Sequence, residues 1–152
     1  MQKPDISIQN PEKFNIPKNI EALVFSIFSI LEENMNVVVN ITLVNDIEMT
    51  ELNNNYRGVQ NPTDVLSFEA GIIDPENGKT ILGDIIICYP FVSRQAKTLK
   101  NDIEDEIRLM VIHGLLHLLG YDHHDEKSKQ IMWEKQDQIL KAEKIFLNKI
   151  PE

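Results

Sequence analysis

Residues 107–124 read IRLMVIHGLLHLLGYDHH, and this stretch decides the fold. Apolar side chains surround the segment up to Gly120 almost completely, which is typical of a helix buried at the centre of a domain. All four histidines of the chain lie between His113 and His124. The stretch therefore predicts a central helix that carries ionisable rings on an otherwise apolar surface.

The spacing of three histidines predicts a metal site. His113 and His117 stand four residues apart, so a helix places both rings on one face. Gly120 can end that helix in the left-handed conformation, and the returning chain can bring His123 to the same point. Three imidazole nitrogens are typical of a zinc ion whose fourth position stays open to water. We expect one zinc ion per chain.

Two other interpretations of these histidines stay open. They can form a hydrogen-bonded cluster inside the core, without a metal. They can also belong to a closed structural site, in which Asp122 or His124 is the fourth ligand. Nickel, copper or iron can occupy the same nitrogen ligands. A cysteine-rich structural site is excluded, because Cys88 is the only cysteine.

The ligand spacing is also that of the metzincin proteases, with one difference. Those enzymes carry a glutamate directly after the first histidine, and it activates the attacking water. This chain has Gly114 at that position. Peptide hydrolysis by the usual route therefore lacks its general base, although the metal ligands are retained.

Around the central helix, periodicity predicts strands and helices that are mixed without strict alternation. Strands are expected over residues 5–9, 36–44, 64–69 and 81–88. Helices are expected over residues 17–33, 46–56, 90–100, 101–120 and 125–146, with Asp46 and Asn101 as N-terminal caps. We predict an α+β fold: one domain over residues 1–152, with a small mixed sheet of about four strands, about five helices and the metal ligands on the buried central helix.

Composition limits the function classes. The net charge of −9 disfavours nucleic-acid binding through a general electrostatic field, so any such binding must be local. The amino terminus lacks the layout of a signal peptide, no apolar run is long enough for a membrane span, and the single cysteine fits a reducing compartment. We expect a cytoplasmic protein that is not associated with a membrane.

Three segments together resemble the YbeY family of bacterial endoribonucleases. They are residues 113–123 (HGLLHLLGYDH), residues 55–68 (NYRGVQNPTDVLSF) and residues 82–85 (LGDI). The resemblance implies a metal-dependent endoribonuclease specific for single-stranded RNA, which acts in maturation of the small-subunit ribosomal RNA 3′ end and in ribosome quality control. It implies ribosomal RNA and the ribosome or ribosome-associated proteins as partners. It also assigns His113, His117 and His123 as zinc ligands and Arg57 as a functional arginine.

Further residues are candidates for work on RNA. Arg57 can bind a phosphate through two parallel hydrogen bonds, or it can simply pair with a surface carboxylate. Asp122 can accept a proton or orient an imidazole, or it can cap a turn. Lys97 can contact a phosphate, or it can simply be a charged residue on a solvent-exposed helix face. Glu69 stands where many members of the family have proline, and its charge is expected to affect affinity for RNA.

The sequence is also compatible with two functions other than an endoribonuclease. One is a metal-dependent hydrolase of peptides or small molecules, which the acidic composition favours and Gly114 opposes. The other is a non-catalytic ribosome assembly factor whose zinc is structural. The fourth coordination position distinguishes them, because a protein ligand there favours a structural role and water favours catalysis.

Overall fold

The structure is a computed structural model that describes residues 2–151. Its elements follow the chain in this order: β1 (Asp5–Gln9), α1 (Ile20–Ile30), β2 (Val37–Val44), α2 (Asp46–Arg57), β3 (Val65–Ile73), β4 (Thr80–Cys88), α3 (Tyr89–Leu99), α4 (Ile103–Leu118) and α5 (Glu126–Ala142).

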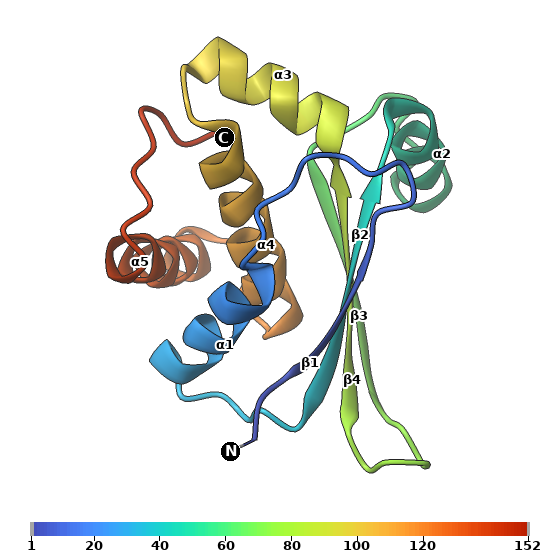
Figure 1. Ribbon diagram of the computed structural model, residues 1–152, viewed down its shortest axis with the longest axis vertical. Coiled ribbons are helices and arrows are strands. Elements are labelled where there is room, and N and C mark those ends of the chain that lie inside the picture. The colour runs from blue at the N-terminus through green and yellow to red at the C-terminus, as the bar shows by residue number, and fades with distance from the viewer. Residues whose placement is uncertain (1, 152) are drawn as a thin grey trace.

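The four strands form one mixed sheet in the order β1-β2-β4-β3. Strands β1, β2 and β4 are parallel to one another, whereas β3 pairs with β4 in antiparallel orientation. Helix α1 connects β1 to β2, and the β3–β4 hairpin extends beyond the rest of the sheet (Figure 1). The predicted α+β fold, with one small domain and a mixed four-stranded sheet, is confirmed.

The helices cover the two faces of the sheet unequally. Helices α1 and α4 pack on one face and α5 lies outside α4, whereas α2 lies on the other side of the sheet (Figure 1). The larger core lies between the sheet and α4, and its fully buried members include Ile41, Ile85 and Leu115. A second, smaller cluster under α2 includes Met49 and Leu66. Helix α4 is therefore the central helix that the sequence predicts.

Both predicted N-terminal caps are off by one residue. The cap of α2 is Asn45, whose side chain accepts from the Glu48 backbone N–H, with the reciprocal bond also present. The cap of α4 is Asp102, not Asn101. Asn101 instead uses its side chain on the segment after α5, where its oxygen accepts from the backbone N–H of Asn148.

Other element boundaries also differ from the prediction, and helix α1 spans Ile20–Ile30 rather than residues 17–33. Helix α5 ends at Ala142 rather than at residue 146, because Lys144 adopts φ +55° and Ile145 N–H bonds back to the Leu140 carbonyl. Strand β3 continues to Ile73 through an irregularity after Glu69. Among the helices of residues 2–151, none combines the length and the apolar character that a membrane span requires.

Candidate metal centre

Three imidazole rings meet at the carboxyl end of α4. His113 and His117 lie on successive turns of that helix, and His123 lies on the turn before α5. One nitrogen of each ring can be chosen so that all three lie within 4.8 Å of one another. The Nε2 atoms of His113 and His117 are 3.2 Å apart. The chain therefore brings together the three residues that the sequence selects as metal ligands.

The turn that carries His123 is built by glycine. Gly120 has φ +100°, a conformation that other residues rarely adopt. Its N–H bonds to the His117 carbonyl and the Tyr121 N–H bonds to the Leu116 carbonyl, both at 3.0 Å. This is the hydrogen-bond pattern of a Schellman motif, which closes a helix and reverses the chain. The reversal returns His123 to the helix that it has just left.

A second glycine lets α4 approach the sheet. A Cβ on Gly114 would lie 2.7 Å from Ile85 Cγ2 and 3.1 Å from Ser67 Oγ. The Ser67 hydroxyl donates to the Gly114 carbonyl at 3.2 Å, so β3 contacts the helix backbone directly. A larger side chain such as glutamate cannot occupy this position unless the helix, the strand or the Ile85 side chain shifts. The difference from the metzincin pattern therefore has a packing cause.

The orientation of His113 is fixed by a residue that the sequence analysis missed. The His113 Nδ1 atom lies 3.3 Å from Gln136 Oε1, and an amide oxygen can only accept a hydrogen bond. The tautomer with its proton on Nδ1 satisfies this contact and leaves the lone pair of Nε2 facing the other two rings. Gln136 is only 6% exposed, on the same buried face of α5 as Met132 and Leu140. A glutamine within an apolar stripe is the feature of the sequence that could have indicated this contact.

Burial keeps two of the rings neutral. Desolvation lowers the pKa of His113, although the hydrogen bond to Gln136 opposes the change. Desolvation, followed by the other two imidazoles, lowers the pKa of His117 to about 4. An unprotonated imidazole nitrogen is the form that binds a metal ion. At neutral pH both α4 histidines are therefore in the ligating state.

The donor set fits a tetrahedral metal ion. Zinc–nitrogen bonds of about 2.0–2.1 Å at tetrahedral angles place two ligand nitrogens roughly 3.3 Å apart, and the two α4 nitrogens are 3.2 Å apart. Among residues 2–151, no fourth His, Cys, Asp or Glu joins this cluster. His124 lies outside it and pairs with Asp122 and Asp125. The cluster can therefore hold a metal ion with three protein ligands.

The centre opens into a cleft of about 1940 Å³. One wall is the segment from Thr63 to Glu69, which leads into and forms part of β3; the other is the amino-terminal part of α5. Arg57, the last residue of α2, lines the same cleft. The structure thus brings Arg57 and the three histidines to one surface, although they are far apart in the sequence.

Arg57 is exposed, and no carboxylate within the described range lies at ion-pair distance from it. Gly58, with φ +68°, ends α2 directly after it. The buried Asn53 side chain donates to the Asn61 carbonyl at 2.8 Å and holds the loop that follows. The surface pairing considered for Arg57 is therefore absent, and its guanidinium is available to a ligand.

The other two candidates lie elsewhere. Lys97 is exposed on α3 and does not line the cleft. Asp122 is exposed next to His123, and its carboxylate accepts from the His124 backbone N–H and pairs with the His124 ring. Hydrogen bonding from His124 lowers the pKa of Asp122 and raises that of His124. Asp122 is therefore ionised at neutral pH and held by its neighbour.

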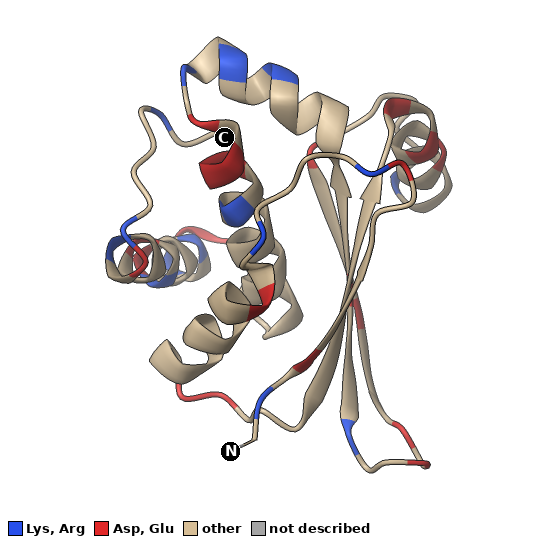
Figure 2. Cartoon of the chain, viewed as in Figure 1, with Lys and Arg blue, Asp and Glu red and all other residues tan. Residues whose placement is uncertain are grey.

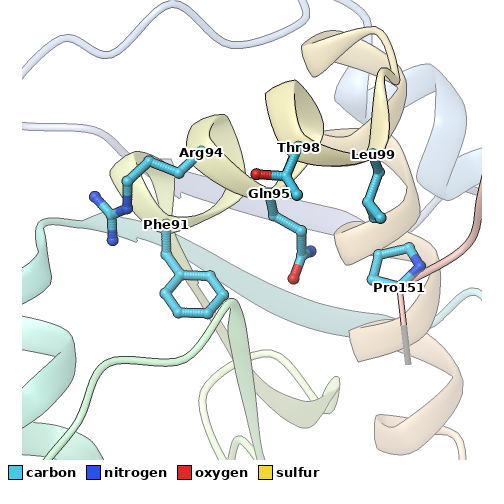
Figure 3. Close-up of a pocket in the computed structure, with 6 residues that line it drawn as sticks. All are labelled: Phe91, Arg94, Gln95, Thr98, Leu99 and Pro151. Atoms are coloured by element: carbon cyan, nitrogen blue, oxygen red, sulfur yellow. The ribbon is translucent and has the colours of Figure 1, made fainter.

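A smaller hollow of about 330 Å³ runs along α3 (Figure 3). Arg94 turns away from the other lining side chains and makes two hydrogen bonds to Asp46, at 2.8 and 2.9 Å. Lys and Arg occur on α3, whereas α5 carries both charge signs (Figure 2). This hollow contains no cluster of metal-ligating residues, so the histidine cleft is the functional-site candidate.

Comparison with known proteins agrees with this choice. The family model described as endoribonuclease YbeY matches residues 5–144. An endoribonuclease YbeY of Aster yellows witches'-broom phytoplasma is 38% identical over 149 residues, which cover 94% of this chain and 95% of that protein. One from Persephonella marina is 43% identical over 106 residues, with 69% of each chain covered.

A solved structure shares the fold. The solution structure of TM1509 from Thermotoga maritima superposes with a TM-score of 0.65 at 33% sequence identity, covering 90% of this chain and 87% of that one. The family match spans all three histidines and Arg57. The resemblance seen in the sequence is confirmed: this chain belongs to the YbeY family of endoribonucleases.

Proposed function

We propose that the chain is a zinc-dependent endoribonuclease that cleaves single-stranded RNA, acting in maturation of the small-subunit ribosomal RNA 3′ end and in ribosome quality control. The observation that carries the proposal is that the rings of His113, His117 and His123 converge in one cleft, which Arg57 also lines without an ion-pair partner among the described residues. Membership of the family supports RNA as the substrate. The proposed partners are ribosomal RNA and the ribosome or its associated proteins, and the proposed location is the cytoplasm.

The residues of the cleft have distinct tasks. A bound zinc ion would supply an acidified water and would polarise a phosphoryl oxygen. Gln136 holds the His113 ring so that Nε2 faces the centre. The Arg57 guanidinium is placed to bind a phosphate through two parallel hydrogen bonds, which the single ammonium of a lysine cannot reproduce. Binding by Arg57 would fix the scissile phosphate beside the three histidines.

Asp122 and Lys97 have smaller proposed roles. An ionised, hydrogen-bonded carboxylate is a weak base, so Asp122 would chiefly hold the turn that carries His123. Lys97 lies outside the cleft and could contact only RNA that extends beyond it. We therefore expect Asp122→Asn and Lys97→Ala to lower cleavage much less than changes at the histidines or at Arg57.

The competing functions have less support. Peptide hydrolysis needs a base at position 114, where packing against Ile85 leaves no room for a side chain. A structural zinc needs a fourth protein ligand, and His124 is already paired with Asp122 and Asp125. Both observations favour the endoribonuclease.

Cleavage of a labelled single-stranded RNA by the zinc-loaded protein tests the proposal. We expect His113→Ala to reduce cleavage to background and Arg57→Ala to reduce kcat by about 10²–10³-fold, the usual loss for one charge-stabilising group. Arg57→Lys should restore little. Arg94→Ala is the matched control, because it removes an arginine that lies outside the cleft.

Two results would contradict the proposal. One is a fully zinc-loaded, folded protein that leaves single-stranded RNA intact. The other is cleavage that survives His113→Ala unchanged, which would point to a contaminating nuclease.

A further inference from the structure

The α5 wall of the cleft carries the only tryptophan of the chain, Trp133. Its side chain is 51% exposed, and Lys129 Nζ lies 4.7 Å from the ring centroid. Lys127 lines the same wall. A large aromatic ring that is half exposed inside a cleft, with a cation over one face, has the composition of a nucleotide-binding surface.

The fold does not use Trp133 in its core. The buried residues of α5 are Met132, Gln136, Ile139 and Leu140, and Trp133 is not among the residues packed against the main hydrophobic cluster. The exposed ring therefore lies outside the core, and Lys129 makes a cation–π contact with it.

The position of Trp133 relates it directly to the metal centre. Gln136, which touches the His113 ring, follows Trp133 by three residues and lines the same cleft. Three residues of an α-helix rise about 4.5 Å, so the tryptophan lies roughly one turn along α5 from the contact with His113. A strand whose phosphate lies at the histidines would have a neighbouring base within reach of this ring.

The charges of the cleft favour an uncharged contribution of this kind to RNA binding. Carboxylates outnumber cations among its lining residues; the carboxylates are Asp64, Glu69, Glu126, Glu134 and Asp137, and the cations are Arg57, Lys127 and Lys129. The chain as a whole carries −9. A general electrostatic field therefore cannot hold a polyanion here, whereas stacking of bases on an aromatic ring does not depend on net charge.

We propose that Trp133 is a base-stacking platform for a single strand of RNA, with Lys129 and Lys127 at the adjoining phosphates. This inference rests on the proposed function, because it assigns a binding subsite for the same substrate. The bases of a single strand are free to stack on the ring, whereas the bases inside a duplex are already paired and stacked on one another. Trp133 would thus contribute both to affinity and to the preference for single strands.

The fluorescence of the single tryptophan reports on the platform directly. We expect a short single-stranded 2′-O-methyl oligoadenylate, added to metal-free protein so that no cleavage interferes, to quench this fluorescence. An abasic oligomer of equal length and charge, and the same sequence as a duplex, should leave it nearly unchanged. Equal quenching by the abasic oligomer, or no quenching by the oligoadenylate, would overturn the proposal.

Steady-state kinetics separate binding from catalysis. Stacking on one aromatic ring is typically associated with an affinity change of about tenfold, so Trp133→Ala should raise KM about tenfold with kcat changed less than twofold. Trp133→Phe should retain most of the affinity. Ile131→Ala is the matched control, because Ile131 is 41% exposed on the same helix and does not line the cleft.

An unchanged KM in a folded Trp133→Ala protein would overturn the proposal. This outcome can be distinguished from a failure of the proposed function. If the wild-type protein has no nuclease activity, KM cannot be measured, but the fluorescence test can still be carried out. Base-specific quenching in that case would still assign nucleic-acid binding to Trp133.

Discussion

The two halves of the candidate metal centre are held in different ways. His113 and His117 are part-buried on a helix whose backbone contacts the sheet through Gly114, and both have lowered pKa values. His123 is exposed on a turn formed by Gly120, outside the core. The comparison teaches that two histidines of the cluster are positioned by the packing of the domain and the third by local backbone geometry. Changes to the helix half should therefore affect both stability and metal binding, whereas removal of the exposed His123 ring should affect metal binding alone.

Gly114→Ala should have the largest effect on the stability of the metal-free protein. The new methyl group would lie 2.7 Å from Cγ2 of the fully buried Ile85, so the Ile85 side chain, the helix or the strand must shift. Overpacking of this kind costs about 1–3 kcal/mol in the free energy of unfolding, which urea denaturation measures. An unchanged free energy would show that α4 is not held tightly against the sheet.

Gly120→Ala should have a smaller effect with a different cause. Nothing lies within 4 Å of a Cβ at this position, but φ is +100°, so the cost is backbone strain of about 1–2 kcal/mol. Because the same turn carries His123, zinc affinity should fall as well. Calorimetric titration with zinc checks this, and an affinity equal to that of wild type would mean that His123 is positioned by something other than the turn.

His117 should make a pH-dependent contribution to the stability of the metal-free protein. The folded-state pKa of about 4 lies below the ordinary value of 6.5, so the unfolded chain binds a proton that the folded protein does not. The stability of the metal-free protein should therefore decrease as the pH falls from about 6.5 towards 4. His117→Gln should flatten the dependence of Tm on pH between about 6.5 and 5, above the range in which carboxylates titrate. A slope as steep as that of wild type would contradict the assignment.

His123→Ala should have almost no effect on the metal-free protein, within about 0.5 kcal/mol, because the ring is exposed. The variant should nevertheless lose the stabilisation by zinc, which for wild type is about 2.7 kcal/mol at a zinc concentration of 100 times Kd. Thermal melts with and without zinc measure both quantities. A variant that keeps the zinc-dependent gain in Tm would show that two histidines hold the metal alone.

The sequence predicted the structure well where a residue type has a single common structural role. The apolar surround of α4, the histidine spacing and Gly120 together predicted the central helix, the cluster and the chain reversal. The cap of α2 and the cap of α4 were each assigned one residue away, because Asn45, Asp46, Asn101 and Asp102 are all competent caps and tertiary contacts decide among them.

Other features depend on contacts that no local pattern shows. The end of α5 was missed because a lysine, Lys144, takes the left-handed position that glycine usually marks. Gln136 was missed because its task becomes visible only when α5 packs beside His113. The cleft likewise joins Arg57 to the histidines through strand order, which the sequence did not specify.

X-ray absorption at the zinc edge of the loaded protein tests the central claim most directly. We predict three imidazole nitrogens and one non-protein oxygen at about 2.0 Å from the metal, with one imidazole lost in His123→Ala. A spectrum with fewer than three imidazoles, or with four protein ligands, would contradict the claim that His113, His117 and His123 form an open metal centre.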